Sequence, residues 1–337
     1  MRPMRLAPNQ LRRNYRGGRA LAALRGVPEL AGAGPEDWVA SVTTAWGASA
    51  GSGLSTLPDG RLLRDVLAAA PAAFLGEAHV GRFGADTGLL VKLLDAGERL
   101  PVHHHPDGSF AARHLGLAHG KTEAWYVAAA SSPDPVVWIG FREPVAGETL
   151  AGWVSRQDSA AMLGALHRLA VRPGDAIFVP AGTPHAIGEG LLIVELQEPS
   201  DLSVMLEWIG VDGPREGELG LGWEVALGSA DRTGWDAERL AGLRGGGSAA
   251  GPVLELLPAA ARPFFGAQRV RPRPGPGVVL EPAFAVLVVT AGSGRLRTGA
   301  GDLDLRRGDT VLVPHDAGES ELSGDGLDVV RCLPPAP

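Results

Sequence analysis

Two segments of the chain repeat one pattern. Residues 171–190 read VRPGDAIFVPAGTPHAIGEG, and residues 305–326 read LRRGDTVLVPHDAGESELSGDG. In both, a basic residue and a Gly-Asp pair are followed by a hydrophobic run and a proline. Gly-Asp favours a turn, and proline suits the exposed end of the strand that follows. Two copies so far apart in the chain predict two related β-barrels; the alternative is two unrelated hairpin entries.

The rest of the chain favours a mainly β fold with a few short helices. Short apolar runs recur between glycines and prolines, which is typical of a sandwich or barrel. Helical periodicity is clearest in residues 60–76 and 155–170. We expect two barrels of the jelly-roll type: an N-terminal domain at 1–242 with small helical insertions, a glycine-rich linker at 243–252, and a C-terminal domain at 253–337.

Composition and charge narrow the classes of function. Lys and Arg number 31 against 38 Asp and Glu, and the chain has no long basic run, which argues against a nucleic-acid partner. No segment approaches the roughly 20 apolar residues that span a bilayer, and the N-terminal residues lack the apolar core of a secretory signal. The only cysteine, Cys332, cannot form an internal disulfide. We therefore expect a cytoplasmic protein.

A candidate metal site begins at three consecutive histidines. Side chains alternate along a strand, so His103 and His105 point to one face and His104 to the other. Pro106 and the residues after it end that strand. In the next strand Glu123 is the corresponding carboxylate, so two imidazoles and one carboxylate can converge inside a barrel.

The first copy of the repeat supplies a fourth ligand. Gly174, Pro180, Gly182 and His185 match G(X)5PXG(X)2H, the second metal-binding motif of the cupin superfamily. Three neutral imidazoles and a carboxylate suit Zn, Fe, Mn, Co or Ni, with positions left for water or substrate. The second copy has no equivalent set, because Glu319 replaces His185. The C-terminal barrel is therefore expected to be a structural partner.

The motifs together resemble those of the type I mannose-6-phosphate isomerases (phosphomannose isomerases), which are zinc-dependent enzymes with two cupin domains. The resemblance covers most of residues 10–210, and it is carried by LLVKLLDAGERLPVHHHPD (89–107), GKTEAWYV (120–127), PAGTPHAIGEG (180–190) and VELQEPSD (194–201). It implies one Zn²⁺ per chain, with Mn, Co, Fe or Ni as possible substitutes. The ligands it implies are His103, His105, Glu123 and His185.

Four positions bear on catalysis. The resemblance implies active-site roles for Lys121, which precedes the ligand glutamate, and for Asp201 of the Ser-Asp motif. Position 103 is usually Gln in the family, but it is His in this chain. An Arg that normally stands four residues after the Asp is replaced by Met205. Lys121, Arg142 and Arg16 are candidates for the missing cation.

The activity implied by the resemblance is a metal-dependent aldose–ketose isomerisation. It interconverts mannose 6-phosphate and fructose 6-phosphate through a cis-enediol, so the partner is a small sugar or sugar phosphate. Because the Arg is missing, two alternatives stay open: an isomerase of an unphosphorylated or different sugar, and a cupin metalloprotein that is not an isomerase, either an iron oxygenase or a non-catalytic binder. The oligomeric state is left open.

Overall fold

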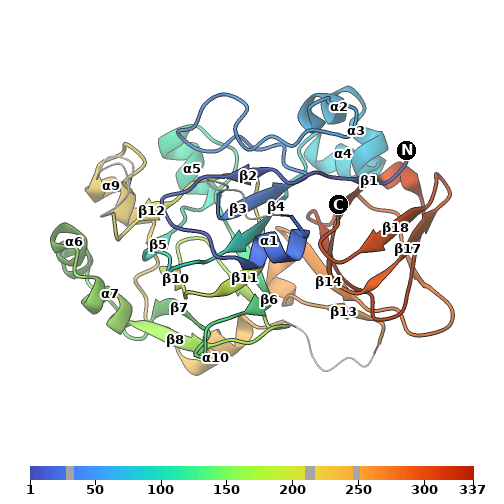
Figure 1. Ribbon diagram of the computed structural model, residues 1–337. Coiled ribbons are helices and arrows are strands. Elements are labelled where there is room, and N and C mark those ends of the chain that lie inside the picture. Colours follow the sequence, from blue (N-terminus) through green and yellow to red (C-terminus); the bar gives the residue numbers. More distant parts are fainter. Residues whose placement is uncertain (28–33, 209–216, 246–250) are drawn as a thin grey trace.

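A computed structural model describes residues 1–27, 34–208, 217–245 and 251–337. The strands in these residues form four antiparallel sheets, arranged as two sandwiches with short helices at their edges (Figure 1). This arrangement confirms the prediction of a mainly β, cupin-type fold. Part of the linker predicted at 243–252, residues 246–250, lies outside the described residues, and the domain boundaries remain a prediction. No helix in the described ranges is long and apolar enough to cross a membrane.

The N-terminal sandwich consists of a six-stranded and a five-stranded sheet. The six-stranded sheet has the order β2 (Gln10–Leu11), β3 (Glu36–Val39), β4 (Leu90–Asp95), β11 (Leu191–Gln197), β6 (Glu123–Ala130) and β9 (Ala176–Val179). The five-stranded sheet has the order β12 (Val204–Met205), β5 (His103–His104), β10 (His185–Ile187), β7 (Val136–Phe141) and β8 (Leu166–Ala170). An apolar core that includes Trp125, Ile139 and Ile193 fills the space between them.

The C-terminal sandwich has the same two-layer plan. Its larger sheet has the order β1 (Met4–Arg5), β19 (Thr310–Val313), β16 (Ala285–Ala291), β21 (Asp328–Leu333), β14 (Gly266–Val270) and β13 (Val253–Glu255). Its smaller sheet has the order β15 (Val278–Leu280), β20 (Ser320–Ser323), β17 (Ser293–Thr298) and β18 (Leu303–Arg306). The first strand of the chain, β1, thus belongs to this C-terminal sheet.

The two six-stranded sheets pack against each other through their outer faces. Alternation along β6 sends Trp125 into the N-terminal sandwich and Tyr126 to the opposite face. There, Tyr126 joins an apolar cluster that also contains Val286 and Val330 of the C-terminal sheet. One continuous core therefore holds the two sandwiches together.

The two copies of the sequence repeat form the same turn. In the first, the Asp175 side chain accepts from the Arg172 N–H at 3.1 Å, and in the second Asp309 accepts from the Arg306 N–H at 3.0 Å. The glycine before each Asp has a positive φ, which favours glycine because it lacks a Cβ. Each turn leads into a buried strand, β9 or β19. The repeat therefore marks equivalent turns in the two sandwiches.

Short helices cover the remaining faces. They are α1 (Ala20–Arg25), α2 (Leu63–Ala69), α3 (Pro71–Leu75), α4 (Glu77–Phe83), α5 (Gly108–Leu115), α6 (Gly147–Arg156), α7 (Ser159–Ala165), α9 (Trp223–Ala226) and α10 (Ala237–Gly242). The helix predicted at 60–76 corresponds to α2 and α3. The helix predicted at 155–170 is only partly correct, because residues 166–170 form strand β8. The side chains of β8 vary in exposure from one residue to the next, as expected for a strand with one face toward the core.

Candidate metal centre

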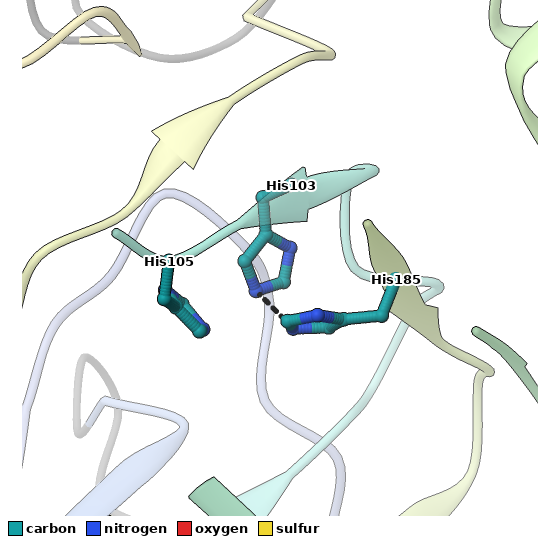
Figure 2. Close-up of side chains that lie close together, drawn as sticks. All are labelled: His103, His105 and His185. Atoms are coloured by element: carbon teal, nitrogen blue, oxygen red, sulfur yellow. Dashed lines mark hydrogen bonds between the residues drawn. The ribbon is translucent and has the colours of Figure 1, made fainter. Parts of the chain in front are cut away.

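Three histidine side chains converge at one end of the N-terminal sandwich. His103 lies on β5, His105 follows that strand directly, and His185 begins β10. The two strands are antiparallel neighbours with His103 paired to His185, so all three rings point to the same face (Figure 2). One ring nitrogen from each lies within 4.8 Å of the others, and all three residues are buried.

Hydrogen bonds fix the tautomer of each ring. The Nδ1 atoms lie 2.7–2.8 Å from backbone carbonyl oxygens, those of Pro101, Leu202 and Thr183. A carbonyl oxygen only accepts, so each Nδ1 carries the proton and each Nε2 presents a lone pair. Burial lowers the pKa of His103 and of His185 to about 3, which keeps both rings neutral.

The lone pairs of His103 and His185 face one another without a proton between them. The Nε2 atoms of His103 and His185 are 3.0 Å apart (Figure 2). Two neutral acceptors at that distance repel, whereas a cation that accepts all the lone pairs converts the repulsion into binding. Nδ1 donation to a carbonyl oxygen is also the usual second-shell support of a metal-bound imidazole. The donor set therefore fits a divalent metal.

Glu123 completes the set from the opposite sheet. It begins β6, and its two carboxylate oxygens lie 3.1 Å from His105 Nε2 and 3.2 Å from His185 Nε2. Trp125 Nε1 donates to the same carboxylate at 3.0 Å. Burial opposes its ionisation, but the ammonium of Lys121 keeps the pKa of Glu123 below its ordinary value. All four residues predicted as ligands thus meet at one point.

His104 and Lys121 lie on the sides that alternation predicts. His104 points away from the cluster, and its Nε2 lies 2.8 Å from the Ser229 hydroxyl. Lys121 faces the cluster, with Nζ 2.8 Å from His105 Nε2 and 2.7 Å from Glu123. Burial lowers the pKa of Lys121, but the nearby carboxylates outweigh burial and raise it above its ordinary value.

Asp201 is held in a network of charges beside this cluster. Its carboxylate accepts two hydrogen bonds from the Arg13 guanidinium, at 2.9 and 3.1 Å, and one from Lys92 at 3.3 Å. Burial raises the pKa of Asp201, but these two cations lower it below the ordinary value. An anion stabilised in this way is a poor proton acceptor, so the geometry suits an orienting role better than that of a base.

Two functional candidates were not predicted from the sequence. Glu195 on β11 is buried with one oxygen 3.4 Å from Lys121 Nζ, and burial raises the pKa of Glu195 to about 7. The signal was available, because Glu195 and Gln197 are polar at alternate positions of an apolar strand. Arg13 gave no such signal, since it lies in an irregular segment far from the other site residues in the chain.

The three cations proposed to replace the missing Arg lie in different parts of the structure. Met205 lies on β12, paired with His103, and faces the cluster. Lys121 is beside the ligands, as described. Arg16 is largely exposed and pairs with Glu98 at 2.9 Å, and Arg142 donates to the Gly164 carbonyl oxygen on an exposed surface. Among the described residues, Arg13 is the arginine that lines the ligand pocket.

Two cavities meet at this site. The inner one, of about 40 Å³, is lined by His103, Lys121, Glu123 and Glu195. The outer one, of about 1040 Å³, is lined by the N-terminal segment and by Trp46. Both are lined by Arg13, Asn14, Tyr15, Ser203 and Met205. A ligand can therefore extend from the histidine cluster into a much larger space.

The chain is similar in sequence to known enzymes, although it matches no protein-family model. It is 28% identical to the mannose-6-phosphate isomerase of Streptococcus mutans over 244 residues, which is 72% of each chain. The structure superposes on that of the mannose 6-phosphate isomerase from Bacillus subtilis with a TM-score of 0.77, at 23% identity, covering 98% of this chain and 99% of the other.

A further solved structure has the same fold. It is a mannose 6-phosphate isomerase bound with zinc and yttrium, with a TM-score of 0.74 at 18% identity, and it covers 99% of this chain and 100% of that one. The likeness in sequence spans most of the chain, and the likeness in fold spans nearly all of it. The chain is thus a homologue of the mannose-6-phosphate isomerases and shares their fold, as its histidine motifs predicted.

Proposed function

We propose that the protein is a metal-dependent isomerase that interconverts mannose 6-phosphate and fructose 6-phosphate. The observation that carries this proposal is the convergence of three unprotonated Nε2 atoms and the Glu123 carboxylate in a buried pocket. The homologous enzymes named for this activity support the choice of substrate. The single cysteine also leads us to propose a cytoplasmic location.

His103, His105, Glu123 and His185 would hold the metal, and we propose zinc because a related structure is bound with it. When bound, such an ion polarises the oxygens of a sugar and stabilises negative charge as a Lewis acid. The protein's own contribution is to bury these groups away from bulk water, which strengthens every electrostatic interaction with the reacting atoms.

Lys121 and Asp201 take different parts in the proposed reaction. The ammonium of Lys121 sits among the ligands, where it can donate to a sugar oxygen that gains charge in the enediol step. A proton must also pass between C1 and C2, and Glu195, whose pKa is raised to about 7, is the group beside Lys121 that can accept and return it. Asp201 positions Arg13 at the entrance of the inner cavity.

Metal removal tests the proposal directly. Treatment with a chelator should abolish the conversion of mannose 6-phosphate to fructose 6-phosphate in a coupled assay, and Zn, Mn or Co should restore it. Metal content measured by mass spectrometry should rise to one ion per chain as activity returns. Full activity in a metal-free preparation would contradict the metal site, and metal-loaded protein that turns over no mannose 6-phosphate would contradict the assigned substrate.

A further inference from the structure

One cation stands at the point where the inner and outer cavities meet. Arg13 belongs to the N-terminal segment 11–18 (LRRNYRGG), and its side chain is 22% exposed. It lines both cavities together with Met205, at the position where the family resemblance predicts Arg. Two elements far apart in the chain therefore meet at this point, one with an uncharged side chain and the other with a guanidinium.

The guanidinium of Arg13 is held in one orientation. Asp201 accepts from both terminal nitrogens, at 2.9 and 3.1 Å, and Arg13 Nε lies 3.2 Å from Glu36. Glu36 is itself fixed by the Tyr15 hydroxyl and by Trp38 Nε1, each at 2.8 Å. These contacts use three of the five N–H groups of a guanidinium, and the other two can donate to a ligand. The cation is therefore positioned before any ligand binds.

The outer cavity is lined by charged side chains. Arg12, Arg13 and Arg16 all line it, against the carboxylates of Glu98 and Asp201. In a hexose 6-phosphate the phosphate lies at the opposite end of the sugar from C1 and C2. When those two carbons are at the histidine cluster, the phosphate must point out of the inner cavity, which is too small to contain it. It then passes the residues shared by both cavities.

We propose that Arg13 binds the phosphate of the substrate and determines the preference for phosphorylated over free sugars. This inference rests on the proposed function and names the residue that supplies its substrate specificity. Planar guanidinium groups form paired, charge-assisted hydrogen bonds with phosphate oxygens. Arg13 thus supplies, from the N-terminal segment, a positive charge that position 205 lacks.

The test compares kcat/KM for mannose 6-phosphate with that for mannose. In the native protein the phosphorylated sugar should be preferred by at least about 100-fold, the scale of one charge-assisted contact. Arg13→Met should remove most of that preference by lowering kcat/KM for mannose 6-phosphate while leaving the value for mannose within a few-fold. Arg13→Met combined with Met205→Arg should restore at least ten-fold of the preference, because the cation returns to the same cavity from another strand.

Two further variants separate binding from folding. Arg13 also pairs with Asp201 and Glu36, so Arg13→Met leaves two carboxylates without their cation. Combining Arg13→Met with Asp201→Asn removes one of those unpaired charges. The double variant should show the same loss of preference for mannose 6-phosphate. Arg142→Met removes an exposed arginine outside both cavities and should leave the preference unchanged. Equal loss on the two sugars, or no loss, would overturn the role of Arg13.

If the native protein isomerises neither sugar, a binding measurement tests the proposed role of Arg13. Calorimetric titration of the metal-loaded protein with mannose 6-phosphate and with mannose then replaces turnover. Binding of mannose 6-phosphate that is lost in Arg13→Met and kept in Arg142→Met would support the phosphate contact, although the proposed isomerase function would be wrong. If mannose 6-phosphate does not bind to the native protein, or binds equally well to Arg13→Met, the proposed phosphate contact is overturned.

Discussion

The histidines of the site show how a single position in the chain decides whether a side chain faces the candidate metal centre. His103 and His104 are adjacent in the chain and both are buried, yet only His103 faces the cluster. The difference follows from strand alternation, which turns consecutive side chains to opposite faces. His104 instead contacts Ser229 in the part of the molecule covered by helices.

This difference predicts opposite outcomes for two similar substitutions. His185→Ala removes one of four ligands and should lower the affinity for the metal by at least ten-fold, whereas His104→Ala should retain one metal ion per chain. Metal content after dialysis, measured by mass spectrometry, distinguishes them, and circular dichroism checks that both variants fold. Loss of metal from His104→Ala with the fold intact would show that the ligand set is wrongly assigned.

At the scale of elements, partly buried polar contacts tie loops to the sheets around the site. His119 precedes β6, and its Nε2 lies 2.5 Å from a carboxylate oxygen of Asp86, in the loop before β4. Its Nδ1 lies 3.9 Å from Glu198, which follows β11. The half-buried imidazole of His119 therefore links its own loop to the loop before β4 and to the loop after β11.

The His119 contacts predict a pH-dependent contribution to stability. The hydrogen bond to Asp86 and the nearby carboxylate of Glu198 raise the pKa of His119 to about 9, from an ordinary value of 6.5. A raised pKa favours the protonated form in the folded state, so the stabilisation is complete below pH 6.5 and is lost as the pH rises through 9. Because these groups are partly exposed, we expect a contribution of about 1 kcal/mol.

Urea unfolding at several pH values can measure this contribution. Between pH 6 and 9.5 the free energy of unfolding of the native protein should fall by about 1 kcal/mol more than that of His119→Gln. Below pH 6 the native protein should be the more stable of the two. Parallel pH profiles for the two proteins would mean that His119 forms no effective ion pair.

At the scale of the whole molecule, the N-terminal residues join the two sandwiches. Strand β1 pairs with β19 of the C-terminal sheet, and the Leu6 N–H donates to the Thr310 carbonyl oxygen. Arg25 at the end of α1 pairs with the fully buried Asp37 of β3, and it also donates to the Thr310 hydroxyl at 2.8 Å. The buried charge pair thus lies where the two sandwiches meet.

Breaking this pair should destabilise the molecule strongly. Arg25→Met leaves the Asp37 carboxylate buried without its cation, which should lower the free energy of unfolding by about 3–5 kcal/mol. Arg25→Met combined with Asp37→Asn should recover part of the loss. As a control, Arg307→Met removes an exposed arginine that donates to the Ala23 carbonyl oxygen across the same region, and it should cost less than about 1 kcal/mol. Chemical denaturation measures the free energy of unfolding of all three variants. Equal losses of stability for Arg25→Met and Arg307→Met would contradict the importance of the buried pair.

Features that depend on local geometry could be predicted from the sequence. Strand alternation separated His103 and His105 from His104, motif spacing placed His185 with them, and the repeated Gly-Asp turn indicated two similar sandwiches. These predictions needed only the two-residue period of a strand and the conformation of a turn, both of which act between near neighbours in the chain. The helix predicted to continue through 166–170 was wrong because sheet pairing with β7 overrides a weak local preference for helix.

Which charged side chains meet depends on the folding of distant segments onto one another. Arg13 and Asp201 are 188 positions apart, and Glu195 and Lys121 are 74 apart, so no spacing rule connects either pair. Their contacts depend on sheet order and on the path of an irregular N-terminal segment. Burial then makes the contacts strong, because charges removed from water must be paired with one another. For that reason the convergence of the four proposed ligands could be predicted from motifs, while the cation beside Met205 became visible only in the folded chain.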